Sequence, residues 1–214
     1  MMIIAIEGID GAGKNTLTTQ LHDQLTAAGK TVTRLGFPNY GATLFADLAD
    51  DALHGRLGDT ADSAWAMALL FALDRRDSSG ALASAVDSHD VVLLDRYVAS
   101  NVAYTLARTM DSTIIGWLEE LEFGRFELPR PQLTVYLEAP VELAAQRAAG
   151  REVADAARTR DRYERDADLQ SRTAAAYRQL ADAQFGGPWI KVAAQESTAD
   201  SARKVLAAVA EMNR

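Results

Sequence analysis

Short apolar runs alternate along the chain with longer stretches in which apolar residues recur at helical spacing. Short runs of this kind, rich in β-branched and aliphatic residues, predict buried strands of a parallel sheet. The predicted strands are 2–7, 31–37, 91–95, 132–138 and 189–193. The predicted helices are 14–28, 43–54, 62–87, 98–110, 113–124, 161–184 and 198–212. Strands that alternate with helices favour an α/β fold, here a five-stranded parallel sheet with helices on both faces.

Prolines, glycines and polar segments refine this pattern. The long helix over 62–87 can break near Gly80, and the prolines of 128–131 exclude a helix there. Residues 150–160 have no clear apolar period, so we expect a mobile segment that opens onto the next helix. Ligands of such folds bind beyond the carboxyl ends of the strands. The chemistry is therefore expected just after residues 7, 36, 95, 138 and 193.

The composition of the 214 residues is that of a globular protein, with 48% hydrophobic residues and a net charge of −8. No linker or repeat divides the chain, so we expect one domain over residues 1–214. No apolar run could span a bilayer and no secretory signal precedes the first strand, so we expect a soluble, cytoplasmic protein. The acidic charge argues against nucleic-acid and membrane partners. The absence of cysteine excludes disulfides and thiolate metal sites.

The strongest motif follows the first predicted strand. Residues Gly8 to Lys14 read G-x-x-x-x-G-K between a strand and a helix, which is the context of a phosphate-binding loop. Backbone N–H groups of such a loop bind phosphate oxygens, and Lys14 would reach the transferred phosphate. The alternative is an ordinary glycine turn. The candidate phosphate-binding residues are Gly8, Ile9, Asp10, Gly11, Ala12, Gly13, Lys14, Asn15 and Thr16.

Asn15 departs from this motif, which has a serine or threonine at that position to help hold magnesium. An amide oxygen without a hydroxyl weakens or moves the metal site. Asp10 is a candidate replacement ligand, or else a solvated turn residue, and Thr16 can contact a more distal phosphate. Magnesium prefers a few protein oxygens together with phosphates and waters. The sequence therefore allows a working nucleotide site whose metal lies elsewhere.

Asp95 is the last residue of the predicted strand 91–95, and Arg96 follows it directly. An acid at this position of a nucleotide-binding fold faces the magnesium shell, and Arg96 would point into the same crevice. A structural ion pair between the two is the alternative. Asparagine occurs only at positions 15, 39, 101 and 213, so no NKxD motif follows, which argues against a GTPase.

Aromatic and polar residues share helix faces close to these strand ends. Tyr97, Asn101 and Tyr104 have the spacing i, i+4, i+7, which favours a nucleoside-binding face over a packing seam. Phe71 and Arg75 also lie four apart, so that a ring could stack on a base while the guanidinium binds its carbonyl. Phe71 taken alone fits the core better.

Two other segments carry candidate residues. Phe37 and Tyr40 flank a proline turn at the end of the strand 31–37. Six arginines lie between residues 147 and 165, where a closing segment could neutralise a phosphoryl group in the transition state. We assign this role to Arg151 and Arg158. A solvated, salt-bridged helix is the alternative, which we favour for Arg160 and Arg165.

These segments together resemble the bacterial thymidylate kinases, and most closely the actinobacterial members. The shared signatures are EGIDGAGKNTL, FPNYG, FALDRR, VVLLDRYVASNVAY and RDRYERD, in the family's order and approximate spacing over nearly the whole chain. The resemblance implies a P-loop fold like that of nucleoside monophosphate kinases. It also implies transfer of the γ-phosphoryl group of ATP to dTMP, which gives dTDP and ADP in dTTP synthesis, with Mg²⁺.

The resemblance also implies a role for each matching residue. The loop 8–16 binds the ATP phosphates, Arg147 lies near the adenine, and a lid covers about 147–160. Phe71 stacks on thymine, Arg75 binds its 4-oxo group, and Ser100, Asn101 and Tyr104 surround the base and deoxyribose. The residues around the sugar and acceptor phosphate are Asp10, Phe37, Tyr40, Arg96, Arg158 and Tyr163. The catalytic residues are Lys14, Arg96, Arg151 and Asp10, and the candidate magnesium ligands are Asp10, Glu164 and Asp95.

Other functions remain open. Asn39 replaces an arginine that the family usually carries after FP, so one phosphate contact could be missing. A deoxynucleoside kinase acting on a free 5′-hydroxyl would also carry an Asp-Arg pair, but it would need a carboxylate base. A non-catalytic nucleotide-binding module would explain Asn15. The family forms homodimers, and the apolar stretch 64–73 could supply such an interface.

Overall fold

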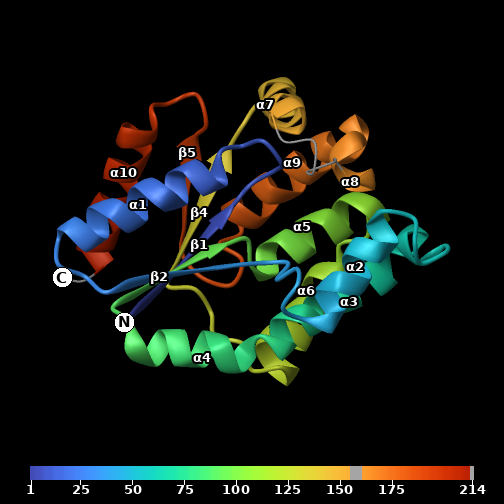
Figure 1. The fold of residues 1–214 in the computed structure, drawn as a ribbon, viewed down its shortest axis with the longest axis horizontal. Coiled ribbons are helices and arrows are strands. Elements are labelled where there is room, and N and C mark those ends of the chain that lie inside the picture. Colours follow the sequence, from blue (N-terminus) through green and yellow to red (C-terminus); the bar gives the residue numbers. More distant parts are fainter. Residues whose placement is uncertain (155–160, 213–214) are drawn as a thin grey trace.

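The central element is a five-stranded parallel sheet with the strand order β2-β3-β1-β4-β5 (Figure 1). The computed structural model describes residues 1–154 and 161–212, and for 151–154 it describes the backbone alone. The strands are β1 (Met2–Glu7), β2 (Val32–Gly36), β3 (Val91–Asp95), β4 (Leu133–Glu138) and β5 (Trp189–Ala193). All five predicted strands are thereby confirmed, as is the predicted sheet.

Helices cover both faces of the sheet. The helices are α1 (Lys14–Ala27), α2 (Leu44–Leu53), α3 (Ala64–Asp77), α4 (Ser79–Ser88), α5 (Val98–Thr109), α6 (Thr113–Glu119), α7 (Val141–Ala154), α8 (Arg162–Arg165), α9 (Ala167–Asp182) and α10 (Thr198–Met212). A short 3-10 turn (Thr60–Asp62) precedes α3, and a π-helical segment (Glu120–Arg125) continues α6. Helices α1 and α10 pack together on one face, and α5 and α9 on the other.

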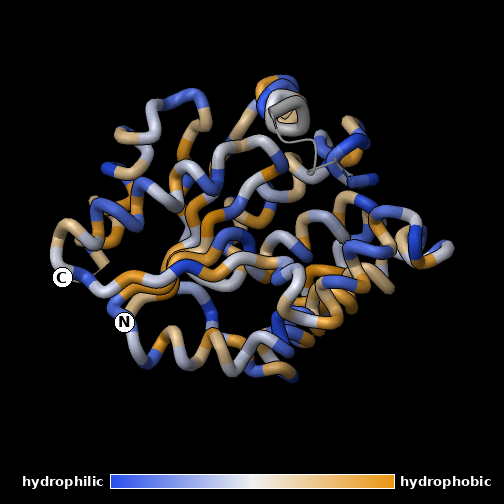
Figure 2. The backbone as a smooth tube through the Cα atoms, in the orientation of Figure 1, coloured by the Kyte–Doolittle hydropathy of each residue, from blue (hydrophilic) through white to orange (hydrophobic). Residues whose placement is uncertain are grey.

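The core lies in the three middle strands, whose apolar side chains are buried on both faces. Ile3, Ile4, Ile6, Val92, Leu93 and Val135 are all fully buried. Figure 2 shows the hydrophobic positions concentrated along these strands. Within the described ranges, no helix combines the length and hydropathy needed to cross a membrane.

The strand register brings the predicted active positions to one edge of the sheet. Asp95 at the end of β3 lies opposite Ile6 of β1 and Gly36 of β2. Glu138 at the end of β4 lies opposite Ala193 at the end of β5. The loops that follow the five strands therefore meet above the same edge, where ligands of parallel α/β folds bind.

The helix predicted over 62–87 breaks at Ser78, which confirms the break predicted near Gly80. Two other helical predictions need correction. The helix predicted over 161–184 is split, because Asp166 has an extended backbone and caps α9 by accepting a hydrogen bond from the Leu169 N–H. Residues 150–154, for which the sequence predicted no helix, belong to α7.

Candidate active site

A cavity of about 1420 Å³ opens at the carboxyl ends of the strands, where the sequence predicted the chemistry. It extends from the β1–α1 loop to helix α3 and to residues 161–164. Predicted site residues in its lining are Asp10, Gly11, Gly13, Lys14, Asn15, Thr16, Phe37, Tyr40, Phe71, Arg75, Asp95, Arg96, Ser100, Asn101, Tyr104, Arg147, Tyr163 and Glu164. The cavity thus brings together residues that lie up to 154 positions apart in the chain, from Asp10 to Glu164.

Two glycines shape the β1–α1 loop. Gly11 has a φ of +82°, and a Cβ there would lie 1.9 Å from the backbone oxygen of Ala144 in α7. Gly13 forms the N-cap of α1 in the left-handed region, with a φ of 104°. Neither position tolerates a side chain. The loop therefore lies closely against α7 and leads directly into a helix N-terminus, the arrangement that binds phosphate.

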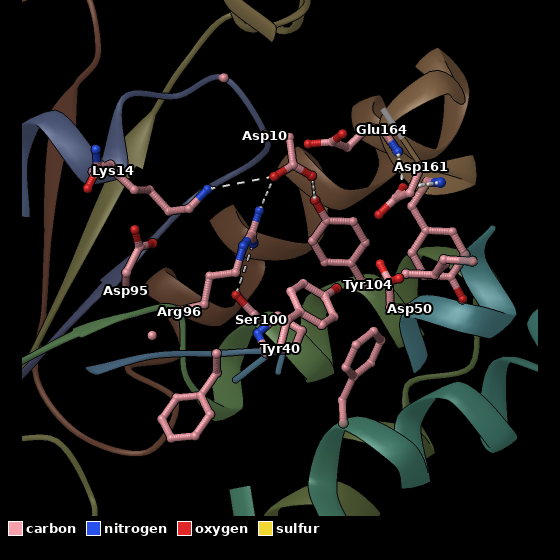
Figure 3. A pocket seen from close by; sticks show the side chains of 18 of the residues that line it. Asp10, Lys14, Tyr40, Asp50, Asp95, Arg96, Ser100, Tyr104, Asp161 and Glu164 are labelled. Carbon is pink, nitrogen blue, oxygen red and sulfur yellow. Dashed lines mark hydrogen bonds and ion pairs between the residues drawn. The ribbon is translucent and has the colours of Figure 1, made fainter. Parts of the chain in front are cut away.

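Lys14 and Arg96 converge on the carboxylate of Asp10 (Figure 3). The Lys14 ammonium donates to the backbone oxygens of Gly8 and Ile9, both at 3.1 Å, and lies 3.9 Å from Asp10 Oδ1. The Arg96 Nη2 donates to the same Asp10 oxygen, and the Tyr104 hydroxyl donates to Oδ2 at 2.7 Å. Among the described residues, two cations thus share one carboxylate at this point.

The charges of this cluster shift its protonation. Burial raises the pKa of Asp10, but Arg96 and Lys14 outweigh burial and hold that pKa well below its usual range. Burial and the neighbouring Arg96 lower the pKa of Lys14 to about 8, although Asp10 opposes this shift. Asp10 is therefore a stable carboxylate and a poor general base at neutral pH.

Arg96 is held by more than Asp10. Its backbone has a φ of 67°, in the left-handed region that a non-glycine residue rarely adopts. Its Nη1 donates to the Gly8 oxygen and to the Ser100 hydroxyl, both at 3.2 Å. The Arg96 guanidinium pairs with Asp10, so the alternative of a structural ion pair with Asp95 is wrong.

Glu7 lies beneath this cluster and was missed by the sequence analysis. Its fully buried carboxylate accepts hydrogen bonds from the Tyr97 N–H (2.8 Å), the Ser100 hydroxyl (2.6 Å) and the Tyr177 hydroxyl (2.9 Å). Burial raises the pKa of Glu7, against these hydrogen bonds and the charge of Arg96. The sequence did offer one indication of a special role for Glu7, because it is a charged residue at the end of an otherwise apolar strand.

The side chain of Asn15 lines the cavity and contacts Arg34. It is exposed, and its Oδ1 accepts a hydrogen bond from Arg34 Nη2 at 2.7 Å. Arg34 also donates to the Thr19 hydroxyl at 2.9 Å. A guanidinium at this distance disfavours a divalent cation on the same oxygen, because like charges repel.

Phe71, Arg75 and Asn101 line the far end of the cavity, beside the buried Glu122. Arg75 Nε and Nη2 donate to the two Glu122 oxygens at 2.5 Å and 2.8 Å. Asn101 Nδ2 donates to Glu122 Oε1 and to the Ala68 carbonyl, both at 2.9 Å. No motif indicated Glu122, although it lies four residues after Leu118, on the buried side of its helix.

Tyr97 does not share the cavity-facing role of Asn101 and Tyr104, so that prediction was wrong. It is 1% exposed, and its hydroxyl donates to the Pro129 carbonyl at 3.0 Å. Its ring packs against Phe37 and Phe123. Tyr97 is the N-cap residue of α5, and its non-helical backbone turns the side chain toward the core.

The turn after β2 lies against the end of α3. The Asn39 N–H donates to Asp74 at 3.1 Å, and its Nδ2 donates weakly to Ser78 at 3.4 Å. Tyr40 is 48% exposed and lines the cavity. The Asn39 side chain therefore contacts the C-cap residue of α3, where an arginine would have added charge.

The other rim of the cavity comes from α7 and α8. Arg147 donates to the Ala12 and Ala194 carbonyls, at 3.4 Å and 3.2 Å. Tyr163 stacks on Tyr104 with ring centroids 6.1 Å apart, and its hydroxyl accepts from Arg108. Arg158 lies outside the described residues. Arg151 belongs to α7, but its side chain is outside them too.

The candidate metal ligands fall into two groups. Figure 3 shows Glu164 next to Asp10, whereas Asp95 lies apart from both, on the side of Lys14. Among the described residues, no cluster of three or more histidine, cysteine or acidic residues could hold a metal. Mg²⁺ commonly binds one or two carboxylates together with phosphate oxygens, and Asp10 and Glu164 are carboxylates of that kind. Because Arg96 and Tyr104 already donate to the two Asp10 oxygens, a metal on Asp10 would have to displace one of them.

A parallel sheet with a glycine-rich loop, a terminal lysine and a helix N-terminus at its β1–α1 junction defines a P-loop nucleotide-binding protein. The chain belongs to the thymidylate kinase family, whose model, described as thymidylate kinase, matches residues 6–205. This confirms the resemblance and the P-loop kinase fold that it implied.

Similar proteins carry the same description. The thymidylate kinase of Mycobacterium tuberculosis strain H37Rv is 48% identical over 196 residues, which cover 90% of this chain and 92% of that protein. The thymidylate kinase of Leifsonia xyli is 36% identical, over 84% of this chain and 81% of that protein. The probable thymidylate kinase of Thermococcus gammatolerans is 32% identical, over 97% and 95%.

Proposed function

We propose that this protein transfers the γ-phosphoryl group of ATP to dTMP and releases dTDP and ADP. The observation that carries the proposal is that one cavity contains both a group of cations suited to phosphates and a group of side chains suited to a base. Its loop end collects Lys14 and Arg96, and its far end offers Phe71, Arg75 and Asn101. The first set suits phosphates, and the second suits a flat, uncharged base with polar edges.

Phosphoryl transfer depends on positioning and charge neutralisation more than on acid–base catalysis. Lys14 and Arg96 offset the repulsion between two anionic nucleotides at the point of transfer. The acceptor phosphate is already an anion near neutral pH, so we assign no general base. In Arg96 the guanidinium is held by Asp10 and Ser100 before any ligand arrives, which reduces the reorganisation needed for catalysis.

We infer that Asp10 and Glu164 hold Mg²⁺ close to the acceptor phosphate. A bound Mg²⁺ would neutralise phosphate charge and help align the two nucleotides. The Arg34 guanidinium on Asn15 supports a metal position away from Asn15. Asp95 is the remaining candidate, on the other side of Lys14.

The other assignments complete the proposal. The loop 8–16 binds the ATP phosphates, Arg147 lies at the adenine, and Arg151 and Arg158 belong to a lid over about 147–160. Phe37, Tyr40, Tyr104 and Tyr163 surround the sugar and phosphate of dTMP. We also expect one cytoplasmic domain without nucleic-acid or membrane partners.

A homodimer completes this proposal. The exposed Trp65 and Leu69 of α3 lie on one side of that helix, and Trp65 contacts Trp117 of α6 edge-to-face, with ring centroids 5.0 Å apart. Two copies of such an apolar face would bury it. The molar mass in solution tests this, and a monomer at micromolar concentration would exclude it.

The deoxynucleoside kinase is the weaker alternative. It would need a carboxylate that accepts the proton of a 5′-hydroxyl, and the lowered pKa of Asp10 makes that carboxylate a poor acceptor. A non-catalytic module would bind ATP without turnover.

A coupled ADP-release assay separates these functions. Purified protein with ATP and Mg²⁺ is given dTMP, dUMP, dCMP, dGMP or thymidine in turn. We expect ADP release with dTMP well above the rate without acceptor, and none with thymidine. Turnover with thymidine but not dTMP would establish the alternative, and binding without turnover would exclude both kinases.

A further inference from the structure

Glu122 is a fully buried acid that none of the roles above includes. It lies in the π-helical segment Glu120–Arg125 and contacts Arg75 and Asn101 of the proposed base-binding end. A buried carboxylate is costly unless charged and polar partners surround it. Arg75 is that partner, because its Nε and Nη2 meet both Glu122 oxygens in a bidentate pair, at 2.5 Å and 2.8 Å.

The same carboxylate fixes the orientation of the Asn101 amide. Asn101 Nδ2 donates one hydrogen to Glu122 Oε1 and the other to the Ala68 carbonyl, both at 2.9 Å. Both partners can only accept. A flipped amide would place its oxygen against two acceptors, which is electrostatically unfavourable. Both donors of the Asn101 amide are therefore used. Its carbonyl oxygen accepts a long hydrogen bond from the Thr105 hydroxyl, at 3.5 Å, and has a second lone pair for a ligand.

Arg75 offers a hydrogen-bond donor, whereas Asn101 offers an acceptor. Arg75 Nη1 has no hydrogen-bond partner among the described residues, and a guanidinium has donors and no acceptor. Arg75 and Asn101 both line the cavity. Arg75 Nη2 and Asn101 Nδ2 donate to the same oxygen, Glu122 Oε1. This end of the cavity therefore offers a ligand one donor from Arg75 and one acceptor from Asn101.

We propose that Glu122 is a positioning residue that sets this donor–acceptor order, and thereby selects the base. Thymine and uracil carry a 4-oxo acceptor next to an N3–H donor, which matches Arg75 and Asn101. Cytosine carries a 4-amino donor next to a bare N3 acceptor, so both contacts would be mismatched. The inference rests on the proposed function, and it adds to that function a residue that orients the two side chains at the base.

The test compares Glu122→Gln with Glu120→Gln, a matched change at an exposed acid of the same segment. A glutamine at position 122 places an amide NH₂, itself a donor, next to the donors Arg75 Nε, Arg75 Nη2 and Asn101 Nδ2. Asn101 relieves this donor–donor repulsion by turning its amide, so that its carbonyl oxygen accepts from the glutamine. We expect kcat/KM for dTMP to fall about 10- to 100-fold, since hydrogen bonds to a charged group are lost. We expect the ratio of kcat/KM for dTMP over dCMP to fall at least about tenfold, and KM for ATP to change less than about threefold.

The base-selectivity ratio distinguishes positioning from a purely structural role. A destabilised enzyme loses activity toward dTMP, dUMP and dCMP alike, and an unchanged ratio in Glu122→Gln would overturn the proposal. Glu120→Gln should match the unmodified protein in rate and ratio.

If Glu122→Gln does not fold, the unmodified protein decides the question. It should bind dUMP within about tenfold of dTMP, and dCMP at least about 100-fold more weakly, in calorimetric titrations. Equal binding of dUMP and dCMP would refute the proposed polarity, while ADP release with dTMP would leave the proposed function intact. No ADP release with any monophosphate would instead refute the proposed function.

Discussion

The two ends of the cavity satisfy their charges in different ways. At the loop end, Lys14 and Arg96 share the single carboxylate of Asp10. At the far end, Arg75 has a carboxylate of its own, and Glu122 uses both oxygens to hold it. The loop end thus gathers two cations at the phosphate-binding loop, whereas the far end pairs its cation with a dedicated carboxylate and presents directed hydrogen bonds.

This difference assigns the rate of phosphoryl transfer to the loop end and the recognition of the base to the far end. Cations at the phosphate-binding loop stabilise the phosphates of any nucleotide, and this stabilisation strengthens as charge builds up in the transition state. A neutral, fully buried network provides selectivity instead, because a mismatched base leaves polar groups unpaired. Changes at the loop end should therefore lower turnover, and changes at the far end should raise KM for dTMP.

The largest effect is expected at Lys14. Lys14→Ala should lower kcat about 1000-fold, because a cation at the transferred phosphate is lost. Binding of dTMP in calorimetry should change less than about threefold. Lys30→Ala, an exposed lysine just beyond the end of α1, is the control. Near-normal turnover of Lys14→Ala would remove the catalytic assignment of the loop end.

Arg75 tests the far end. Arg75→Ala should raise KM for dTMP about 100-fold and leave KM for ATP nearly unchanged, since the lost contacts are to the base. It also leaves Glu122 buried without its cation, so the free energy of unfolding should fall by about 3 to 5 kcal/mol. Arg76→Ala, an exposed neighbour on the same helix, controls for the helix itself. Equal rises in both KM values would contradict the division between the two ends.

Glu164 tests the inferred metal position. Glu164→Gln should raise the Mg²⁺ concentration for half-maximal rate about tenfold, because one carboxylate ligand becomes neutral. Magnesium titrations at saturating dTMP measure this. An unchanged titration would favour a metal held by Asp95.

The pH dependence isolates Lys14. With a pKa of about 8, Lys14 is protonated below that pH and neutral above it. The value of kcat/KM for ATP, which reports the free enzyme, should fall as pH rises from 7.5 to 9.5, approaching tenfold per pH unit. Phosphates have their second pKa near 6 and do not titrate in this range. Lys14→Arg should remove the decline, and a decline that persists in this variant would assign it to another group.

The smallest effect is expected at Asn15. Asn15→Ala should change kcat and the magnesium titration less than about threefold, because its oxygen already accepts from Arg34. A tenfold or greater loss of magnesium affinity would place the metal at Asn15 after all.

Features of this molecule that depend on neighbouring residues in the sequence could be predicted, whereas features that depend on residues far apart in the chain could not. The strands and the loop 8–14 were predictable because apolar runs and G-x-x-x-x-G-K are local patterns. Helix ends were less so: α7 extends to Ala154 although its last turn has no apolar period. Tyr97 was placed on the wrong face, because an N-cap residue does not follow the helical spacing of the residues after it.

The missed residues act through contacts far apart in the chain. Glu122 meets Arg75 across 47 positions, and Glu7 meets Tyr177 across 170. No motif spacing encodes such pairs, and only the fold brings them together. Both acids were detectable in one respect, since each is a charged residue at a position that the apolar pattern predicts to be buried.

The fate of the terminal phosphoryl group of ATP tests the central claim most directly. The protein is incubated with ATP carrying a γ-³²P label, dTMP and Mg²⁺, and the nucleotides are separated. The account predicts that the label appears in dTDP, in equal amount to the ADP formed. Label released as inorganic phosphate, or left on ATP while dTMP remains unchanged, would contradict it.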